Sequence, residues 1–242
     1  MENIASRRNR PMICRWLVVS ATGLATALLW DISGFDLELA KLFGGGEGFP
    51  LRHVYALEKV LHTGARNLGW LVLFALTAGA IFPFGVLRFL TTRERIQLPA
   101  TILLCVAVIT LIKLKSHTSC PWELQIFGGL QPYVSHWNFN KLDGGGGRCF
   151  PAGHASTGFA FIGGYFAIER RSARLANYWL SGAMAAGIVL GISQQLRGAH
   201  FASHTLWTAW ICWTLSGLID VVCHSGVWKK SKRSPIWSGP SK

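Results

Sequence analysis

The chain has 242 residues, of which 50% are hydrophobic and 14% are charged, and its formal net charge at pH 7 is +13. Soluble domains carry roughly 25% charged residues, so this composition argues against a soluble domain and is typical of a polytopic membrane protein. Nucleic-acid-binding proteins are also basic, but their charges form stripes on polar surfaces, whereas here the basic residues flank apolar runs. We therefore expect one membrane domain over residues 1–242 that binds no nucleic acid.

Apolar runs in chain order predict an all-α bundle of six membrane-spanning helices, after a basic tail (1–11) that we expect to be disordered. The first run resembles a signal peptide, but no clear A-x-A cleavage site follows it, so we interpret it as a membrane anchor. The expected spans cover roughly residues 12–30, 67–90, 98–112, 152–168, 178–196 and 201–222.

The connecting segments differ in character. Residues 31–66 have an apolar spacing that predicts one or two short amphipathic helices at the membrane surface, around the flexible GGGEG. The segments TTRERIQ and ERRSARLAN are read as polar turns. The loop 113–150 is rich in Gly, Pro and Trp, and its aromatic residues form either an interfacial belt or a lid that selects a lipid head group. The basic tail 224–242 is expected to be disordered.

The distribution of basic residues predicts the orientation. With six spans, fifteen Lys and Arg residues fall on the side of both termini and nine on the opposite side. The positive-inside rule then places both termini in the cytoplasm. The loop 113–150 and the junction RGAH would face outward, into the periplasm if the host is Gram-negative.

Three polar clusters, ITLIKLKSHTSCPW, RCFPAGHAS and GISQQLRGAHFASHTLW, fall at this outward face. Each alone has an ordinary explanation, such as snorkelling lysines or hydrogen-bonded histidines. Together they place many ionisable groups at one membrane level, which usually marks a functional site. Cationic side chains and free N–H groups at a helix start bind phosphate, and histidine can act as nucleophile and general acid. The groups concerned are Lys113, Lys115, Arg148, Arg197, His154, His200 and His204.

These clusters resemble the motifs of the type 2 phosphatidic acid phosphatase superfamily, whose members are membrane lipid phosphatases with a six-helix bundle. That family carries K-x-x-x-x-x-x-R-P, then P-S-G-H, then S-R-x-x-x-x-x-H-x-x-x-D, and the resemblance covers roughly residues 112–210. The segment PAGH, ending at His154, matches the second motif with alanine in place of serine. Lys113 and Pro121 match the first motif, whose arginine position holds Cys120.

The third motif is matched at its serine by Ser193 and at its histidine by His200. Gln194 stands at the arginine position, and His204 stands at the aspartate position. The chain is thus similar to a divergent member of the family. A neutral His204 can accept a hydrogen bond but supplies no negative charge.

The resemblance implies a role for each matching residue. His200 would attack phosphorus to form a phosphohistidine, and His154 would protonate the leaving oxygen. Lys113 would bind the phosphate oxygens together with backbone N–H groups near Gly153. His204, one helical turn beyond His200, would take the place of the aspartate that orients the nucleophile. The family implies no required metal or other cofactor.

Several nearby residues are candidates to complete the site. Arg197 lies three residues from the missing third-motif arginine, and Arg148 directly precedes the second motif, so we expect either to replace a lost arginine. Lys115 is a further candidate phosphate ligand. Cys120 and Cys149 each lie beside a motif in the outward loop, and they are either two free thiols or, in an oxidising compartment, a disulfide.

The sequence therefore predicts a phosphatase of a lipid phosphate monoester or diphosphate at the outer face of a bacterial inner membrane. Candidate substrates are lipid A, undecaprenyl (di)phosphate, phosphatidylglycerol phosphate and phosphatidic acid. One alternative is a lipid-to-lipid phosphotransferase on the same fold, and another is a relative that has lost activity. A third is a metal or haem protein with ligands among His154, His200 and His204, although Lys113 and Arg197 would repel a cation.

Overall fold

The computed structural model describes residues 4–138 and 140–224, and all regular structure in these ranges is helical. The expected all-α class is therefore confirmed for the described part of the chain. The longer helices are α1 (Ile4–Ser33), α3 (Ala65–Ile81), α4 (Thr92–Lys115), α7 (Ala173–Leu196) and α8 (Ala202–His224). The shorter ones are α2 (Phe35–Lys41), η1 (Ala56–Gly64), η2 (Gly85–Phe89), η3 (Pro121–Glu123), η4 (Gln125–Phe127), α5 (Gly153–Phe159), η5 (Ala160–Ile162) and α6 (Gly163–Glu169).

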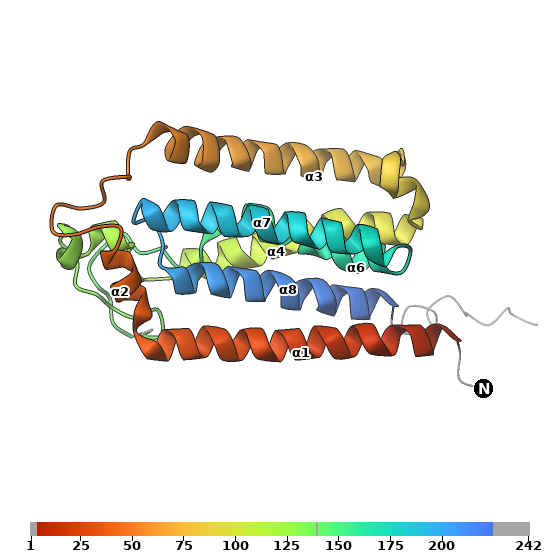
Figure 1. Cartoon of the computed structure of the whole chain (residues 1–242), viewed down its shortest axis with the longest axis horizontal. Helices are drawn as coiled ribbons and strands as arrows, with labels where there is room; N and C mark the ends of the chain where they lie inside the picture. Colours follow the sequence, from red (N-terminus) through yellow and green to blue (C-terminus); the bar gives the residue numbers. More distant parts are fainter. Residues whose placement is uncertain (1–3, 139, 225–242) are drawn as a thin grey trace, which may run out of the picture.

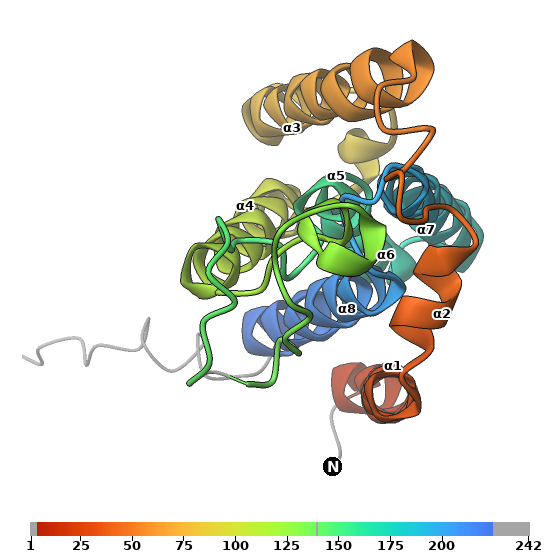
Figure 2. The same cartoon turned by 90° about the vertical axis from the view of Figure 1, so that its left-hand side faces the viewer.

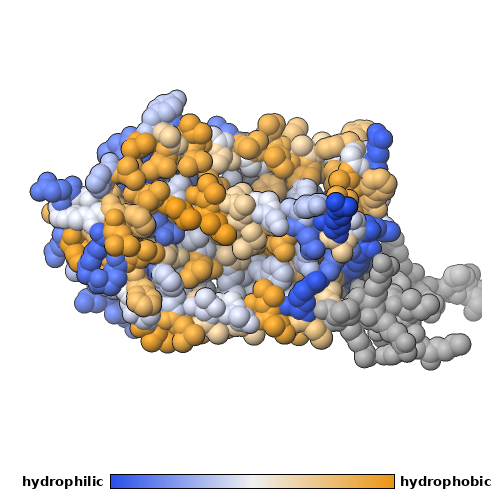
Figure 3. Space-filling view, in the orientation of Figure 1, coloured by the Kyte–Doolittle hydropathy of each residue, from blue (hydrophilic) through white to orange (hydrophobic). Residues whose placement is uncertain are grey.

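Five segments in the described ranges are long and apolar enough to cross a membrane, which indicates a multi-pass membrane protein. Hydrophobic residues cover much of the flank in Figure 3, and hydrophilic ones gather at the two ends of the described structure. The expected fourth span, 152–168, is instead a succession of three short helices, none of them long enough alone. The five candidate spans are Met12–Ser33, Ala56–Phe89, Thr92–Lys115, Ala173–Leu196 and Ala202–His224.

The three short helices α5, η5 and α6 form a column in the middle of the bundle, in contact with α4, α7 and α8 (Figures 1 and 2). Small residues make this possible, because a Cβ atom on Gly158 would lie 2.2 Å from the backbone nitrogen of Gly187 in α7. Helix α1 packs on the outer side of α8, where Trp210 Nε1 donates to the carbonyl of Ser20 at 2.8 Å. The second motif, at the start of α5, therefore lies at one end of this central column.

Two expected turns are shorter than predicted, because a helix cap lies within each segment. Thr91 caps α4: its hydroxyl accepts from the Glu94 N–H, and the Glu94 carboxylate accepts from the Thr91 N–H at 2.7 Å. This capping box turns TTRERIQ into the first turns of a helix. Ser172 caps α7 by accepting from the Leu175 N–H, so most of ERRSARLAN is helical as well.

The ends and the first connection also differ from expectation. Residues 4–11 are the first turns of α1 and not a disordered tail, whereas 1–3 and 225–242, most of the expected C-terminal tail, lie outside the described residues. Within 31–66, α2 is a short separate helix. The second expected surface helix, η1, runs directly into α3. It is therefore continuous with a helix of the bundle and not a separate helix.

Candidate active site

The three motif segments meet at the end of the bundle that also carries α2 and the loop 116–152 (Figure 2). The end of α4 contributes Lys113, and the first turn of α5 contributes His154. The turn between α7 and α8 contributes Arg197 and His200, and the first turn of α8 contributes His204. The first residues of α1 and the last residues of α8 lie at the opposite end of the bundle (Figure 1).

A disulfide joins Cys120 to Cys149, with their Cα atoms 5.2 Å apart. Next to it, the Cys149 N–H donates to the carbonyl of Thr118 at 3.1 Å. The Cys149 sulfur also lies 3.1 Å from the carbonyl oxygen of Ala199 and 3.6 Å from Nδ1 of His200. The disulfide therefore ties the first motif to the second and brings both against the third.

Replacing Cys120 or Cys149 by serine is expected to lower the free energy of unfolding by about 3 to 4 kcal/mol in the chain-entropy model, since the two residues are separated by 29 positions. Thermal unfolding of the purified protein in detergent measures this. The double variant should lose no more than either single one. Cys14→Ser, at an exposed free thiol, is the matched control. Additive losses in the double variant would contradict a shared bond.

His200 and His204 are buried against each other, with their Nδ1 atoms 3.4 Å apart. Because Nδ1 of His200 is engaged in this way, Nε2 is the nitrogen left for chemistry. Burial lowers the pKa of His200 well below its usual value, and the positive charge of Lys113 lowers it further. His200 is therefore neutral at neutral pH, as a nucleophile must be.

His154 lies half-buried in a group of cationic side chains. Its ring is tilted by 31° to the ring of His62, and the two centroids are 3.7 Å apart. Burial lowers the pKa of His154 to about 3, and the neighbouring charges of His62, Lys113, Arg66 and Arg197 act in the same direction. This concentration of positive charge around one histidine is the electrostatic property expected of an anion site.

His62 and Arg66 are functional candidates that the sequence does not single out. Both were assigned to a surface segment, and the continuous run from η1 into α3 carries them to the site instead. A signal was present: the two residues are four positions apart, on one helical face, directly before an apolar run. A titratable pair in that place resembles the polar ends of the other clusters.

Lys113 and Lys115 go to different places, because two positions along a helix rotate a side chain to nearly the opposite face. A Cβ atom on Gly153 would lie 3.6 Å from Cδ and 3.9 Å from Nζ of Lys113, so Lys113 lies over the start of α5. Lys115 is exposed and lines a separate pocket together with His117 and Lys141. We therefore expect Lys113, rather than Lys115, to contact the phosphate.

The two candidate arginines, Arg197 and Arg148, also lie in different surroundings. Arg197 is buried, with Nε donating to the carbonyl of Arg52 at 2.9 Å and Nη1 lying 3.4 Å from Oε1 of Gln194. Arg197 thus stands beside the residue that replaced the motif arginine, near His154. Arg148 is exposed at a positive φ of 61°, and its N–H donates to the carbonyl of Ser116. We therefore expect Arg197, rather than Arg148, to take the place of the missing motif arginine.

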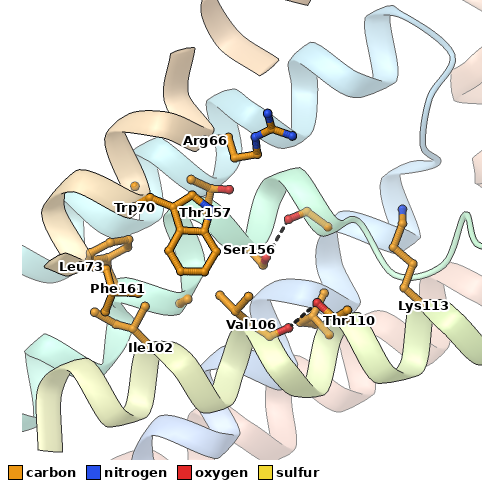
Figure 4. Close-up of a pocket in the computed structure, with 14 residues that line it drawn as sticks. Arg66, Trp70, Leu73, Ile102, Val106, Thr110, Lys113, Ser156, Thr157 and Phe161 are labelled. Carbon is orange, nitrogen blue, oxygen red and sulfur yellow. Dashed lines mark hydrogen bonds between the residues drawn. The ribbon is translucent and has the colours of Figure 1, made fainter. Parts of the chain in front are cut away.

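A groove opens between α3, α4 and α5 beside these groups (Figure 4). Its polar side chains include Arg66 and Lys113, whereas Trp70, Leu73 and Phe161 gather at the other end in Figure 4. Ser156, between them, donates to the carbonyl of Gly153 at 2.6 Å. The groove could therefore hold a molecule with one anionic end and one hydrophobic end.

Cys149, His200 and His204 could in principle hold a metal ion, since one potential ligand atom of each lies within 4.8 Å of the others. However, the Cys149 sulfur is bonded to Cys120 and supplies no thiolate. Lys113 would add a positive charge next to any cation bound there. This donor set fits an anion better than a metal.

Comparison with known proteins gives one match. A profile of the PAP2 superfamily matches residues 94–228, which is more than half of the chain and includes all three motif segments. No curated protein and no solved structure matches the chain.

Proposed function

The chain belongs to the PAP2 superfamily, the type 2 phosphatidic acid phosphatases, as its motifs predict, and from this premise we propose that it hydrolyses a lipid phosphate through a phosphohistidine. Members of this superfamily are phosphatases, which supports activity on a phosphate ester. One observation carries the finer proposal. The neutral, buried His200 shares its surroundings with His154 and with Lys113, whose positive charge acts on it, and Lys113 also lines an apolar groove.

The proposed reaction has two steps. Nε2 of His200 attacks phosphorus, the bond from phosphorus to the lipid oxygen breaks, and that oxygen takes a proton from His154. Water then attacks the phosphohistidine, the N–P bond breaks, and His154 accepts the water proton while inorganic phosphate leaves. Lys113, Arg66 and Arg197 supply positive charge to the phosphoryl oxygens, and this charge stabilises the transition state.

The pKa shifts predict an unusual dependence on pH. The lowered pKa of His200 means that acid does not quench the nucleophile near pH 6.5. With a pKa of about 3, His154 carries no proton in the free enzyme at neutral pH, so the proton must arrive with the substrate. Phosphate monoesters have a second pKa of about 6. We therefore expect kcat/KM to rise as the pH falls from 8 to about 5.5.

This dependence is checked by measuring kcat/KM against pH in detergent micelles, because that quantity reports the free enzyme and free substrate. A loss of kcat/KM on the acid side with an apparent pKa of 6.5 or above would contradict the neutral nucleophile. Lys113→Met removes one of the charges that lower the pKa of His154, so any remaining activity should extend to higher pH.

The groove favours a lipid over a soluble phosphate ester. We expect Val106→Trp, which places a large ring among the groove residues, to lower kcat/KM on a long-chain lipid phosphate by about tenfold or more. The reason is the hydrophobic burial lost, about 0.8 kcal/mol per CH₂ group. Activity on a short water-soluble phosphate ester should change little. Leu103→Trp, at an exposed position on the same helix, is the matched control, and equal losses on both substrates would contradict a chain-binding groove.

The location of the site also belongs to this proposal. The positive-inside count puts both termini in the cytoplasm, and the disulfide supports an oxidising compartment for the loop 116–152. Both agree with a site at the outer face of a bacterial inner membrane. Labelling of an introduced exposed cysteine at Leu130 by a membrane-impermeant thiol reagent in intact spheroplasts tests this orientation, and the absence of labelling would contradict it.

The function itself is tested by phosphate release from a panel of lipid phosphates. The panel contains lipid A, undecaprenyl diphosphate, phosphatidylglycerol phosphate and phosphatidic acid, each labelled at the terminal phosphate. Release of labelled inorganic phosphate by the full chain, together with an acid-labile protein label, is the expected result. Transfer of the label to a second lipid would identify a phosphotransferase. No release and no protein label from any substrate would overturn the proposal.

A further inference from the structure

The third motif leaves an electrostatic question at His204. A phosphohistidine on His200 carries positive charge, and an aspartate at the fourth position beyond it would offset that charge directly. His204 offers only an imidazole. If His200 donates its Nδ1 proton to Nδ1 of His204, 3.4 Å away, the proton of His204 must be on Nε2. That atom is buried, and it has no hydrogen-bond partner among residues 4–138 and 140–224.

A third histidine lies next to His204. The ring of His136 stands at 84° to the ring of His204, with the centroids 5.7 Å apart. At that separation no other side chain fits between the two imidazoles. Phe150 stacks on His136 at 4.2 Å with an interplanar angle of 5° and also touches His204 edge-on at 5.3 Å. The His136 ring is therefore held in one orientation beside the motif.

His136 brings a carboxylate with it. Its Nε2 lies 3.2 Å from Oδ2 of Asp31, and the two side chains are only 7% and 6% exposed. Oδ2 of Asp31 also accepts from Nε1 of Trp137 and Nε1 of Trp207, each at 2.8 Å. Asp31 belongs to α1, far from the motifs in the sequence, yet three donors from the loop and α8 converge on it. Burying a carboxylate costs free energy unless it is paired and hydrogen-bonded. The three donors meet this requirement for Asp31 and place its negative charge next to His136.

We propose that Asp31, through His136, supplies to His204 and His200 the negative charge that an aspartate within the third motif would supply directly. Both are positioning residues, and the inference rests on the proposed phosphohistidine mechanism. As the N–P bond forms, His200 gains positive charge and its Nδ1 proton is drawn towards His204. The buried Asp31 carboxylate stabilises that charge across the rings of His136 and His204, which stand edge to face. Low polarity around the network strengthens the effect.

The decisive test compares Asp31→Asn in two backgrounds. In the unaltered chain we expect it to lower kcat by about 10- to 100-fold, the range known for carboxylates that orient metal-ligating histidines, with KM within about twofold. In the His204→Asp background a carboxylate again lies next to His200, so Asp31→Asn should cost less than about threefold. An equal loss in both backgrounds, or no loss in the unaltered chain, would overturn the proposal.

Asp36→Asn is the matched control. Asp36 is another buried carboxylate from the same part of the chain, and it accepts from Nε1 of Trp30 at 2.8 Å and from the Ser203 N–H at 3.0 Å. It supports the start of α8 without contacting His136 in the described structure. Whatever its substitution costs, that factor should be the same in the two backgrounds, because the effect is structural.

A second measurement does not depend on activity. Nitrogen NMR of ¹⁵N-histidine in the full chain reports the tautomer of each ring. We expect His204 to carry its proton on Nε2, and Asp31→Asn to shift its nitrogen resonances clearly. Unchanged His204 resonances would overturn the inference even if His204→Asp failed to fold. A chain without phosphatase activity but with the expected NMR shift would overturn the proposed function and leave the Asp31 network standing.

Discussion

Replacing His200 by alanine is expected to reduce kcat/KM on a lipid phosphate by about 10⁴- to 10⁶-fold, the range seen when a nucleophile is removed from a covalent mechanism. Nε2 of His200 is the atom proposed to bond to phosphorus, and no neighbour can substitute for it at the same point. The remaining rate should reflect phosphate binding by Lys113 and Arg197 alone. The acid-labile protein label should disappear completely.

His117→Ala is the matched control for this variant. His117 is an exposed histidine at the same end of the bundle, and it lines the neighbouring pocket. Its replacement should leave both kcat/KM and the protein label within about twofold of the unaltered chain. If the His200 variant retained a tenth of the activity, or if the label moved intact to His154, the assignment of the nucleophile would be wrong.

Lys113→Met is expected to have the second largest effect, a loss of about 10²- to 10³-fold in kcat/KM, the usual cost of removing one transition-state donor. Lys113 lies over the start of α5, with Nζ 3.9 Å from where a Cβ atom of Gly153 would be. Its charge reaches both His154 and His200. Methionine keeps the length of the side chain, so the change isolates the charge.

Lys115→Met is the matched control for Lys113→Met. The two lysines are two residues apart at the end of α4, a separation of about 3 Å along the helix axis. Lys115 nevertheless lines a different pocket and should tolerate the change within about twofold. Equal losses in the two variants would show that general surface charge, and not a phosphate ligand, explains the effect of Lys113.

The sequence predicts those parts of the fold that depend on long apolar runs and on local motifs. Helices α7 and α8 begin and end within a few residues of the expected spans, because about twenty apolar residues can hardly form another structure in lipid. The segment PAGH begins a helix at Gly153, as expected. The disulfide forms where the first and second motifs meet, and the sequence alone left both a disulfide and free thiols open.

The remaining features of the site depend on how each helix is rotated about its axis and on contacts between residues far apart in the sequence. Whether Lys113 or Lys115 faces the site is decided by the phase of α4 against α5, which spacing within one helix cannot provide. The spacing around Arg148 likewise gives no sign that the backbone adopts a positive φ there or that the side chain is exposed. Asp31 and His136 come from α1 and the loop, about a hundred residues apart, so no local pattern joined them.

The bond between Cys120 and Cys149 also has a consequence for when the protein becomes an enzyme. Nδ1 of His200 lies 3.6 Å from the sulfur of Cys149, so the bond fixes one wall of the pocket around the proposed nucleophile. In a reducing compartment this wall would lose its covalent link to Cys120. On the proposed topology, we therefore expect the site to gain its full rigidity only after the loop has been exported.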